Sequence, residues 1–147
     1  WKVSHNLRSI MMKLITISAG YIDSFWAPIC EGRIIPNEFI GLNLNNYESA
    51  QKLIEEYLIP KAMKFKSKSW HYYFKETLRY AINFWSNERL YNIYMGVLPE
   101  IPPPQSKYIK MKDFYLLIWT VMYPNEECVV YTPELYKEVP SVEIGSF

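Results

Sequence analysis

Five cationic or titratable side chains recur at helical spacing in the middle of the chain. Each follows the previous one by three or four residues: Lys64, Lys68, His71, Lys75 and Arg79. Because an α-helix has about 3.6 residues per turn, this spacing predicts that all five lie on one helix face. Such a face could bind an anionic partner. It could also support acid–base chemistry, with His71 as the base and Lys75 stabilising developing charge on a phosphate.

Aromatic residues lie among these cations. Trp70 and Tyr72 flank His71. Cations interleaved with aromatic rings can contact phosphates and stack on bases, and they equally suit an acidic protein surface. A solvated helix face without a partner is the simpler alternative. The candidate partner-binding residues are therefore Lys64, Lys68, Trp70, His71, Tyr72, Lys75 and Arg79.

A second, apolar stripe runs along the same segment. Its members are also three or four residues apart: Trp70, Phe74, Leu78, Ala81 and Trp85. Two offset stripes of opposite character predict an amphipathic helix that buries one side. We expect the apolar stripe to be buried and Lys64, Lys68 and Lys75 to be exposed.

The charges are segregated along the chain although its net charge is only +1. Residues 60–80 carry six cations against Glu76 alone, whereas residues 124–147 carry five glutamates against Lys137. This acidic stretch could lie against the basic helix or form a second binding surface. Its candidate partner-binding residues are Glu126, Glu127, Glu134 and Glu138.

Established catalytic and cofactor motifs are absent from the sequence. It contains no phosphate-binding glycine loop, nucleophile elbow, zinc-protease motif or C-x-x-C pair. His5 and His71 are far apart, and two widely spaced cysteines do not match metal-ligand spacing. We therefore expect no cofactor and no metal site.

Helices are expected at about 47–58, 61–85 and 87–95, with breaks near Ser67 and Ser86 and an end at Gly96. Residues 20–46 contain glycine, proline and asparagine at short intervals, which predicts mostly irregular structure. The prolines of residues 99–105 predict a stiff extended linker.

Strands are expected at 13–18, 114–123 and 128–132. The first run is rich in β-branched residues, which favours a strand over the alternative of a helix that begins at Asn6. The other two are apolar and are separated by a Pro-Asn-Glu-Glu turn, which is typical of an antiparallel hairpin. A buried helix starting at Asp113 is the alternative for 114–123. The predicted fold class is α+β, with a small, mostly antiparallel sheet packed on two or three central helices.

Length and composition are consistent with one compact domain. The chain has 147 residues, half of them apolar, which excludes global disorder. Met12 begins a start-like Met-Lys-Leu-Ile-Thr-Ile-Ser run, so residues 1–11 are expected to be a dispensable extension. No apolar run reaches the roughly 20 residues that a membrane helix needs, and two cysteines suit a reducing compartment. We expect a soluble, cytoplasmic protein.

A complementary surface is enough for a binding protein and leaves no catalytic signature. The sequence therefore favours a small non-enzymatic protein that binds another protein, most concretely a bacterial immunity or antitoxin-type protein that neutralises a toxin domain. The alternative is a nucleic-acid-binding or metal-free RNA-cleaving protein that acts through residues 64–79. The small net charge favours a protein partner over nucleic acid.

Overall fold

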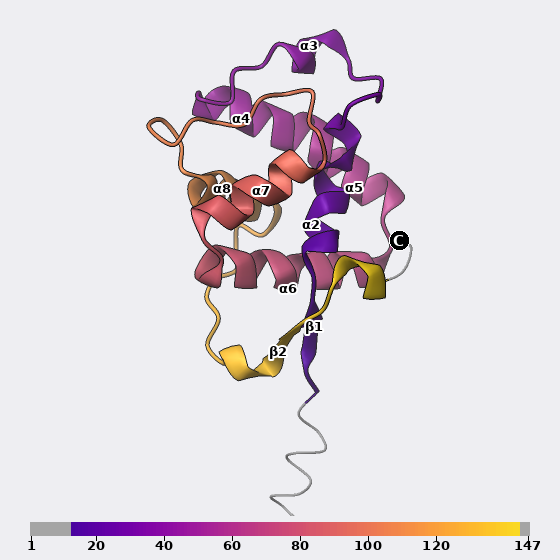
Figure 1. Ribbon diagram of the computed structural model, residues 1–147, viewed down its shortest axis with the longest axis vertical. Coiled ribbons are helices and arrows are strands. Elements are labelled where there is room, and N and C mark those ends of the chain that lie inside the picture. Colours follow the sequence, from indigo (N-terminus) through magenta and orange to yellow (C-terminus); the bar gives the residue numbers. More distant parts are fainter. Residues whose placement is uncertain (1–12, 145–147) are drawn as a thin grey trace, which may run out of the picture.

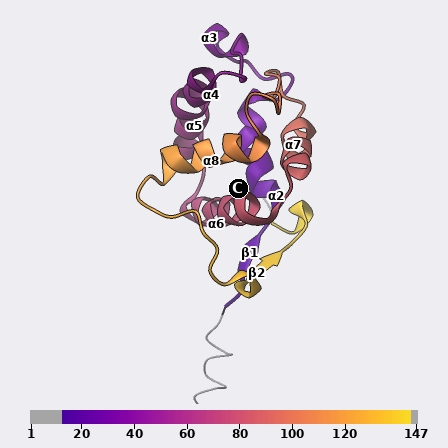
Figure 2. The same ribbon diagram turned by 90° about the vertical axis from the view of Figure 1, so that its left-hand side faces the viewer.

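Helix α2 (Ala19–Trp26) lies at the centre of the molecule. The computed structural model describes residues 13–144, so the expectation about residues 1–11 lies outside the described residues. Helix α6 (Lys68–Phe84) crosses one end of α2, and α7 (Asn87–Gly96) packs along its side (Figure 1). Turned by 90°, the molecule shows α4 and α5 on one side of α2 and α7 on the other (Figure 2). The chain forms one compact, mostly helical domain.

The formation of α2 depends on a serine cap and on a glycine that packs closely. The Ser18 hydroxyl accepts a hydrogen bond from the Gly20 N–H at 3.2 Å, which satisfies one donor of the first turn. A Cβ at Gly20 would lie 2.6 Å from Ile144 Cδ1, so this glycine admits the short helix η4 (Ser141–Glu143) against α2. The expectation that residues 20–46 are mostly irregular is wrong for α2, because Gly20 serves packing and not a turn.

A continuous helical segment follows the short helix α3 (Asn37–Ile40). It consists of α4 (Tyr47–Leu53), a π-helical stretch η2 (Ile54–Leu58) and α5 (Ile59–Phe65). The expected helix at 47–58 is confirmed, and Pro60 does not end it but lies in the first turn of α5, which continues η2.

The break expected near Ser67 is confirmed, so residues 61–85 form two helices, α5 and α6, and not one. Lys66 has an extended backbone, and the Ser67 hydroxyl accepts the Trp70 N–H at 3.1 Å, which starts a new helix. The second expected break is confirmed, since the Ser86 hydroxyl accepts the Arg89 N–H and α7 ends at Gly96.

Residues 114–123 belong to helix α8 (Met111–Met122), so the strand expected there is wrong and the helical alternative is right. The buried residues Phe114, Tyr115, Ile118 and Trp119 recur at helical spacing, while Leu116 is exposed. The run is so apolar because α8 packs against α4, α6 and α7. A helix buried on several sides loses the alternation that marks an amphipathic surface helix.

The sheet contains two strands, β1 (Ile15–Ile17) and β2 (Tyr136–Glu138). Strand β2 directly follows the short helix η3 (Pro133–Leu135). The strand expected at 13–18 is confirmed, but the antiparallel sheet is wrong, because β1 and β2 pair in parallel with Ile15 opposite Tyr136. Residues 128–132 form no strand. The Asn83 side chain on α6 donates to the Cys128 carbonyl at 3.1 Å, so α6 takes the place of a partner strand.

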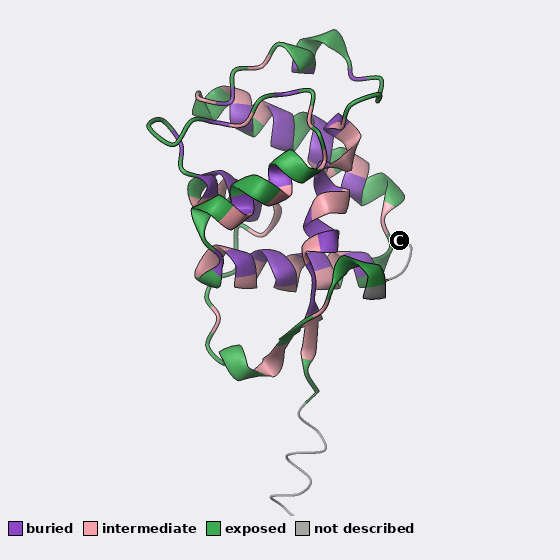
Figure 3. Ribbon diagram, in the orientation of Figure 1, coloured by how far each residue is buried: buried purple, intermediate pink, exposed green. Residues whose placement is uncertain are grey.

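The core is built around the Trp26 ring of α2. This ring stacks on Phe114 at 5.2 Å between centroids and meets the Tyr94 ring edge-on at 4.9 Å. Buried residues occupy the inward faces of the surrounding helices (Figure 3). The proline-rich residues 99–105 close one side, with Ile101 fully buried and its carbonyl bonded by the Tyr94 hydroxyl at 2.6 Å. This core fixes α5 and α6, which carry the candidate site.

Candidate functional site

The cationic stripe is divided between two helices. Lys64 lies on α5, whereas Lys68, His71, Lys75 and Arg79 lie on α6. Since the chain changes direction at Lys66 and Ser67, these five side chains do not form one continuous helix face. The role of each candidate residue therefore depends on its own contacts and exposure.

The apolar stripe on α6 is buried as expected. Its members have at most 5% of their surface exposed: Trp70, Phe74, Leu78, Ala81 and Trp85. The Trp70 and Phe74 rings stack at 4.7 Å, and the Trp70 indole N–H donates to the Ser24 hydroxyl on α2 at 2.8 Å. Although the sequence included Trp70 among the partner-binding residues, the structure places it in the core.

The second half of the cationic stripe is engaged within the protein. Lys75, expected to be exposed, is partly buried and forms a salt bridge with Glu126. The Arg79 guanidinium donates to the Glu127 carbonyl at 2.7 Å and lies 3.3 Å from the Glu76 carboxylate. Its central carbon, Cζ, lies over the Trp119 ring at 4.8 Å from the ring centre. The acidic stretch therefore does lie against the basic helix, as one interpretation of the sequence suggested.

His71 connects α5 to α6. Its Nε2 lies 3.0 Å from the Ala62 carbonyl oxygen, and because a carbonyl only accepts, this nitrogen is the donor. The imidazole is partly buried and meets the Trp70 ring edge-on at 5.0 Å. Its position gives it a role in joining the two helices.

The acidic candidates also have partners within the chain. Glu126 pairs with Lys75, and Glu138 pairs with Arg89 at 2.5 Å. The Glu127 carboxylate accepts a hydrogen bond from the Tyr131 hydroxyl. Glu134 is exposed in η3. Two of the four acidic candidates, Glu126 and Glu138, are therefore neutralised by cations of the same chain.

The accessible part of the basic surface lies where α5 meets α6. Lys64, Lys68 and Tyr72 are exposed there, as are the apolar side chains of Met63 and Phe65, which have 64% and 63% of their surface exposed. The Lys64 ammonium lies 5.2 Å from the centre of the Phe65 ring. We call Met63, Lys64, Phe65 and Lys68 the α5–α6 corner.

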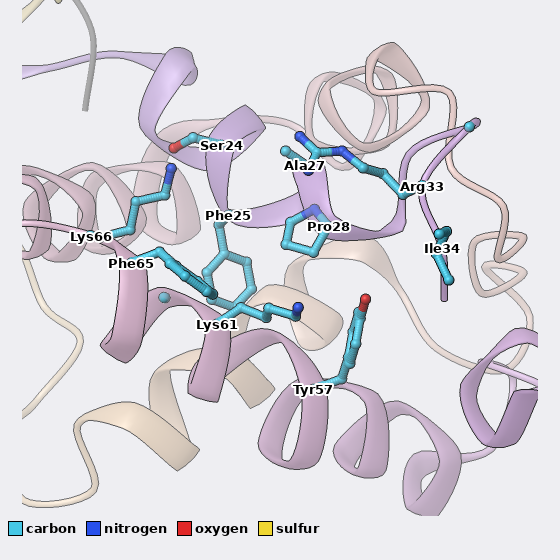
Figure 4. Close-up of a pocket in the computed structure, with 12 residues that line it drawn as sticks. Ser24, Phe25, Ala27, Pro28, Arg33, Ile34, Tyr57, Lys61, Phe65 and Lys66 are labelled. Atoms are coloured by element: carbon cyan, nitrogen blue, oxygen red, sulfur yellow. The ribbon is translucent and has the colours of Figure 1, made fainter. Parts of the chain in front are cut away.

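A cleft of about 570 Å³ lies beside this corner (Figure 4). It is bounded by α2, by the short helix η1 (Ala27–Ile29), by the loop containing Gly32–Ile34, and by η2 and α5. Its cations are Arg33, Lys61 and Lys66. Burial, followed by the charge of Arg33, lowers the pKa of Lys66. Sequence reasoning missed this cleft because Arg33 comes from a segment that carried no periodic signal.

Other titratable groups are occupied in the fold. Burial raises the pKa of the Cys128 thiol to about 11, so at neutral pH it is protonated and a poor nucleophile. Cys30 and Cys128 are free and do not pair with each other.

Within residues 13–144, no group of His, Cys, Asp or Glu side chains could hold a metal ion. The helices of this described part are all too short or too polar to cross a membrane.

No protein-family model matches the chain, and neither a curated protein nor a solved structure is significantly similar to it.

Proposed function

We propose that this chain is a non-enzymatic protein that binds another protein through the α5–α6 corner. In its most concrete form, it is an immunity or antitoxin-type protein that neutralises a toxin domain in the cytoplasm. The observation that carries this proposal is the exposure of Met63 and Phe65 directly beside Lys64 and Lys68. Apolar anchors surrounded by cations are typical of a protein interface whose partner is acidic.

The composition of this surface favours a protein partner over nucleic acid. Nucleic-acid affinity depends on the number of phosphates neutralised, and Lys75 and Arg79 already neutralise carboxylates of their own chain. Exposed Met and Phe side chains gain free energy when an apolar surface covers them, and in nucleic acid only unstacked bases, not phosphates, offer such a surface. The corner therefore suits an acidic protein surface with apolar side chains at its centre.

The acid–base groups near this surface are engaged in packing. The His71 Nε2–H is directed at the Ala62 carbonyl, and Lys75 is held by Glu126. In a neutral His71 this leaves the basic lone pair on Nδ1, whereas Lys75, the cation that would stabilise charge on a phosphate, is already paired. The pairing of Lys75 supports binding rather than turnover as the role of the corner.

Two matched double variants test the proposal. Lys64→Glu with Phe65→Ser alters the corner. Lys107→Glu with Tyr108→Ser alters a similar exposed pair, in which the ammonium lies 5.1 Å from the ring centre, on the loop before α8. Both should fold, because exposed charges contribute little to stability. Each protein encoded beside the gene is purified and titrated with the wild type and both variants by calorimetry, and toxicity is scored by growth on co-expression.

We expect one of these neighbours to be toxic and to be neutralised by the wild type. The corner variant should bind it at least about tenfold more weakly, as loss of an interface anchor predicts, whereas the Lys107 and Tyr108 variant binds normally. Equal binding by the two variants would exclude the corner as the interface. Cleavage of RNA by the purified wild type, abolished in a folded His71→Ala variant, would instead establish the RNA-cleaving alternative.

A further inference from the structure

The cleft beside the α5–α6 corner concentrates positive charge. Arg33, Lys61 and Lys66 all line it, and none of its described lining residues is acidic. The acidic residues nearest along the chain, Asp23, Glu31 and Glu56, are not part of its wall. Among residues 13–144, neither Arg33 nor Lys61 forms a salt bridge. Like charges gathered in a concave, partly apolar site focus the potential and attract an anion.

The walls of the cleft are apolar and aromatic. Phe25, Pro28, Tyr57 and Phe65 contribute carbon surface to it. The Lys61 ammonium lies 5.4 Å from the centre of the Tyr57 ring and 5.7 Å from that of Phe65, so the two rings flank a cation (Figure 4). An aromatic ring beside a cation offers one surface for a flat apolar group and one charge for its acidic substituent.

The size of the cleft matches a small molecule. A volume of about 570 Å³ lies within the range of small-molecule sites, which are mostly apolar and contain a few converging polar groups. The cations come from separate segments, Arg33 from a loop and Lys61 from α5, and both line the same cleft (Figure 4). Burial and Arg33 lower the pKa of Lys66, as expected where like charges approach each other.

We propose that this cleft binds a small organic anion with a flat apolar body. The body lies against the Tyr57 and Phe65 rings. The anionic group, a phosphate or a carboxylate, lies between Arg33 and Lys61, with Lys66 adding to the positive field. This inference goes beyond the proposed function, because it assigns a second ligand to the adjoining cleft, which shares only Phe65 with the corner.

Calorimetry with named probes tests the proposal. Adenosine monophosphate and indole-3-acetate each combine a flat ring with an anion, one a phosphate and the other a carboxylate. Adenosine and inorganic phosphate supply one feature each. We expect saturable 1:1 binding for at least one of the two aromatic anions, at least about tenfold tighter than for adenosine or phosphate alone. The tighter of the two identifies the anionic group. Affinity should fall as salt rises.

Cleft variants locate the binding. Arg33→Gln and Lys61→Gln should each lower the affinity for the aromatic anion by about tenfold. Lys107→Gln and Lys137→Gln, at exposed positions elsewhere, should leave this affinity unchanged. Ile34 is 97% exposed at the rim, so Ile34→Asp adds a carboxylate there without loss of packing and should also weaken binding. These changes leave Lys64 and Phe65 intact, so partner binding at the corner can persist when anion binding is lost.

Two results would overturn the proposal. In the first, neither aromatic anion binds with a dissociation constant below about 1 mM, the weak end of specific affinity. In the second, an anion binds but the Arg33, Lys61 and Ile34 variants retain wild-type affinity, which would place the anion outside the cleft.

Discussion

At the scale of single residues, the Tyr115 hydroxyl joins three helices. It accepts a hydrogen bond from the Trp26 indole N–H at 3.1 Å and donates one to the Leu90 carbonyl at 3.0 Å. Burial raises the pKa of Tyr115, so the hydroxyl keeps the proton that it donates. Trp26, Leu90 and Tyr115 lie on α2, α7 and α8. One oxygen therefore satisfies two buried polar groups in the middle of an aromatic core.

Replacement of this hydroxyl has a definite expected cost. Tyr115→Phe leaves the Trp26 N–H and the Leu90 carbonyl without this partner, so it should lower the free energy of unfolding by about 1–3 kcal/mol in urea titrations. Tyr108→Phe is the control, because Tyr108 is exposed. A cost for Tyr115→Phe within the roughly 0.5 kcal/mol typical of surface changes would show that the buried groups find other partners.

At the scale of elements, α6 holds the chain that follows α8. Arg79 reaches the Glu127 carbonyl and stacks on Trp119, and Asn83 reaches the Cys128 carbonyl. The Tyr136 hydroxyl donates to Glu76 at 2.6 Å. Side chains of α6 thus bind the irregular residues 127–128 and the first residue of β2.

Arg79 should be irreplaceable by lysine in this role. Arg79→Lys keeps the charge but loses the planar fork that bonds Glu127 and lies over Trp119. We expect faster amide hydrogen exchange in a peptide covering residues 124–131 and a loss of about 1–2 kcal/mol in stability. Arg33→Lys, at an exposed position, is the control. Unchanged exchange in residues 124–131 would mean that Lys75, Asn83 and Trp119 are sufficient to hold the segment.

The sequence predicted elements where their local signals were strong. The buried stripe of α6, the break near Ser86 and the end of α7 at Gly96 follow from helical spacing and capping chemistry. Gly20 contributed to the prediction of irregular structure, yet it lies in α2. Its role is to pack against Ile144, which is distant in sequence. The run at 114–123 was ambiguous in periodicity, but its ten residues exceed the usual four to eight of a buried strand.

The candidate site was harder to predict, because charge pairing is a tertiary property. Helical spacing identified Lys64 and Lys68, which are exposed, and equally Lys75, which is paired with Glu126. Nothing local to Lys75 reveals that a segment about fifty residues later returns to it. The cations Arg33 and Lys61 likewise come to line one cleft only in the folded chain.

At the scale of the whole molecule, the two strands connect distant parts of the described chain. β1 and β2 pair in parallel, and the Val139 N–H donates to the Ile17 carbonyl at 2.9 Å. Arg89 on α7 pairs with Glu138, and Ile144 packs against Gly20 on α2. The C-terminal segment therefore closes the fold over α6 and α2, although it contributes few buried residues.

Two truncations compare the structural roles of the two ends. Ending the chain at Thr132 removes β2, leaves the β1 backbone without its partner strand and uncovers Gly20, so several interactions of about 1 kcal/mol each are lost together. For a domain of this size, 1 kcal/mol shifts the melting temperature by a few degrees, so we expect a fall of about 10 °C or more by differential scanning calorimetry. Deletion of residues 1–11 should lower it by only a few degrees, because the buried core of the described chain begins at Ile17. If the N-terminal deletion proves as costly as the C-terminal one, the first eleven residues are part of the fold and the start-like run at Met12 does not mark its beginning.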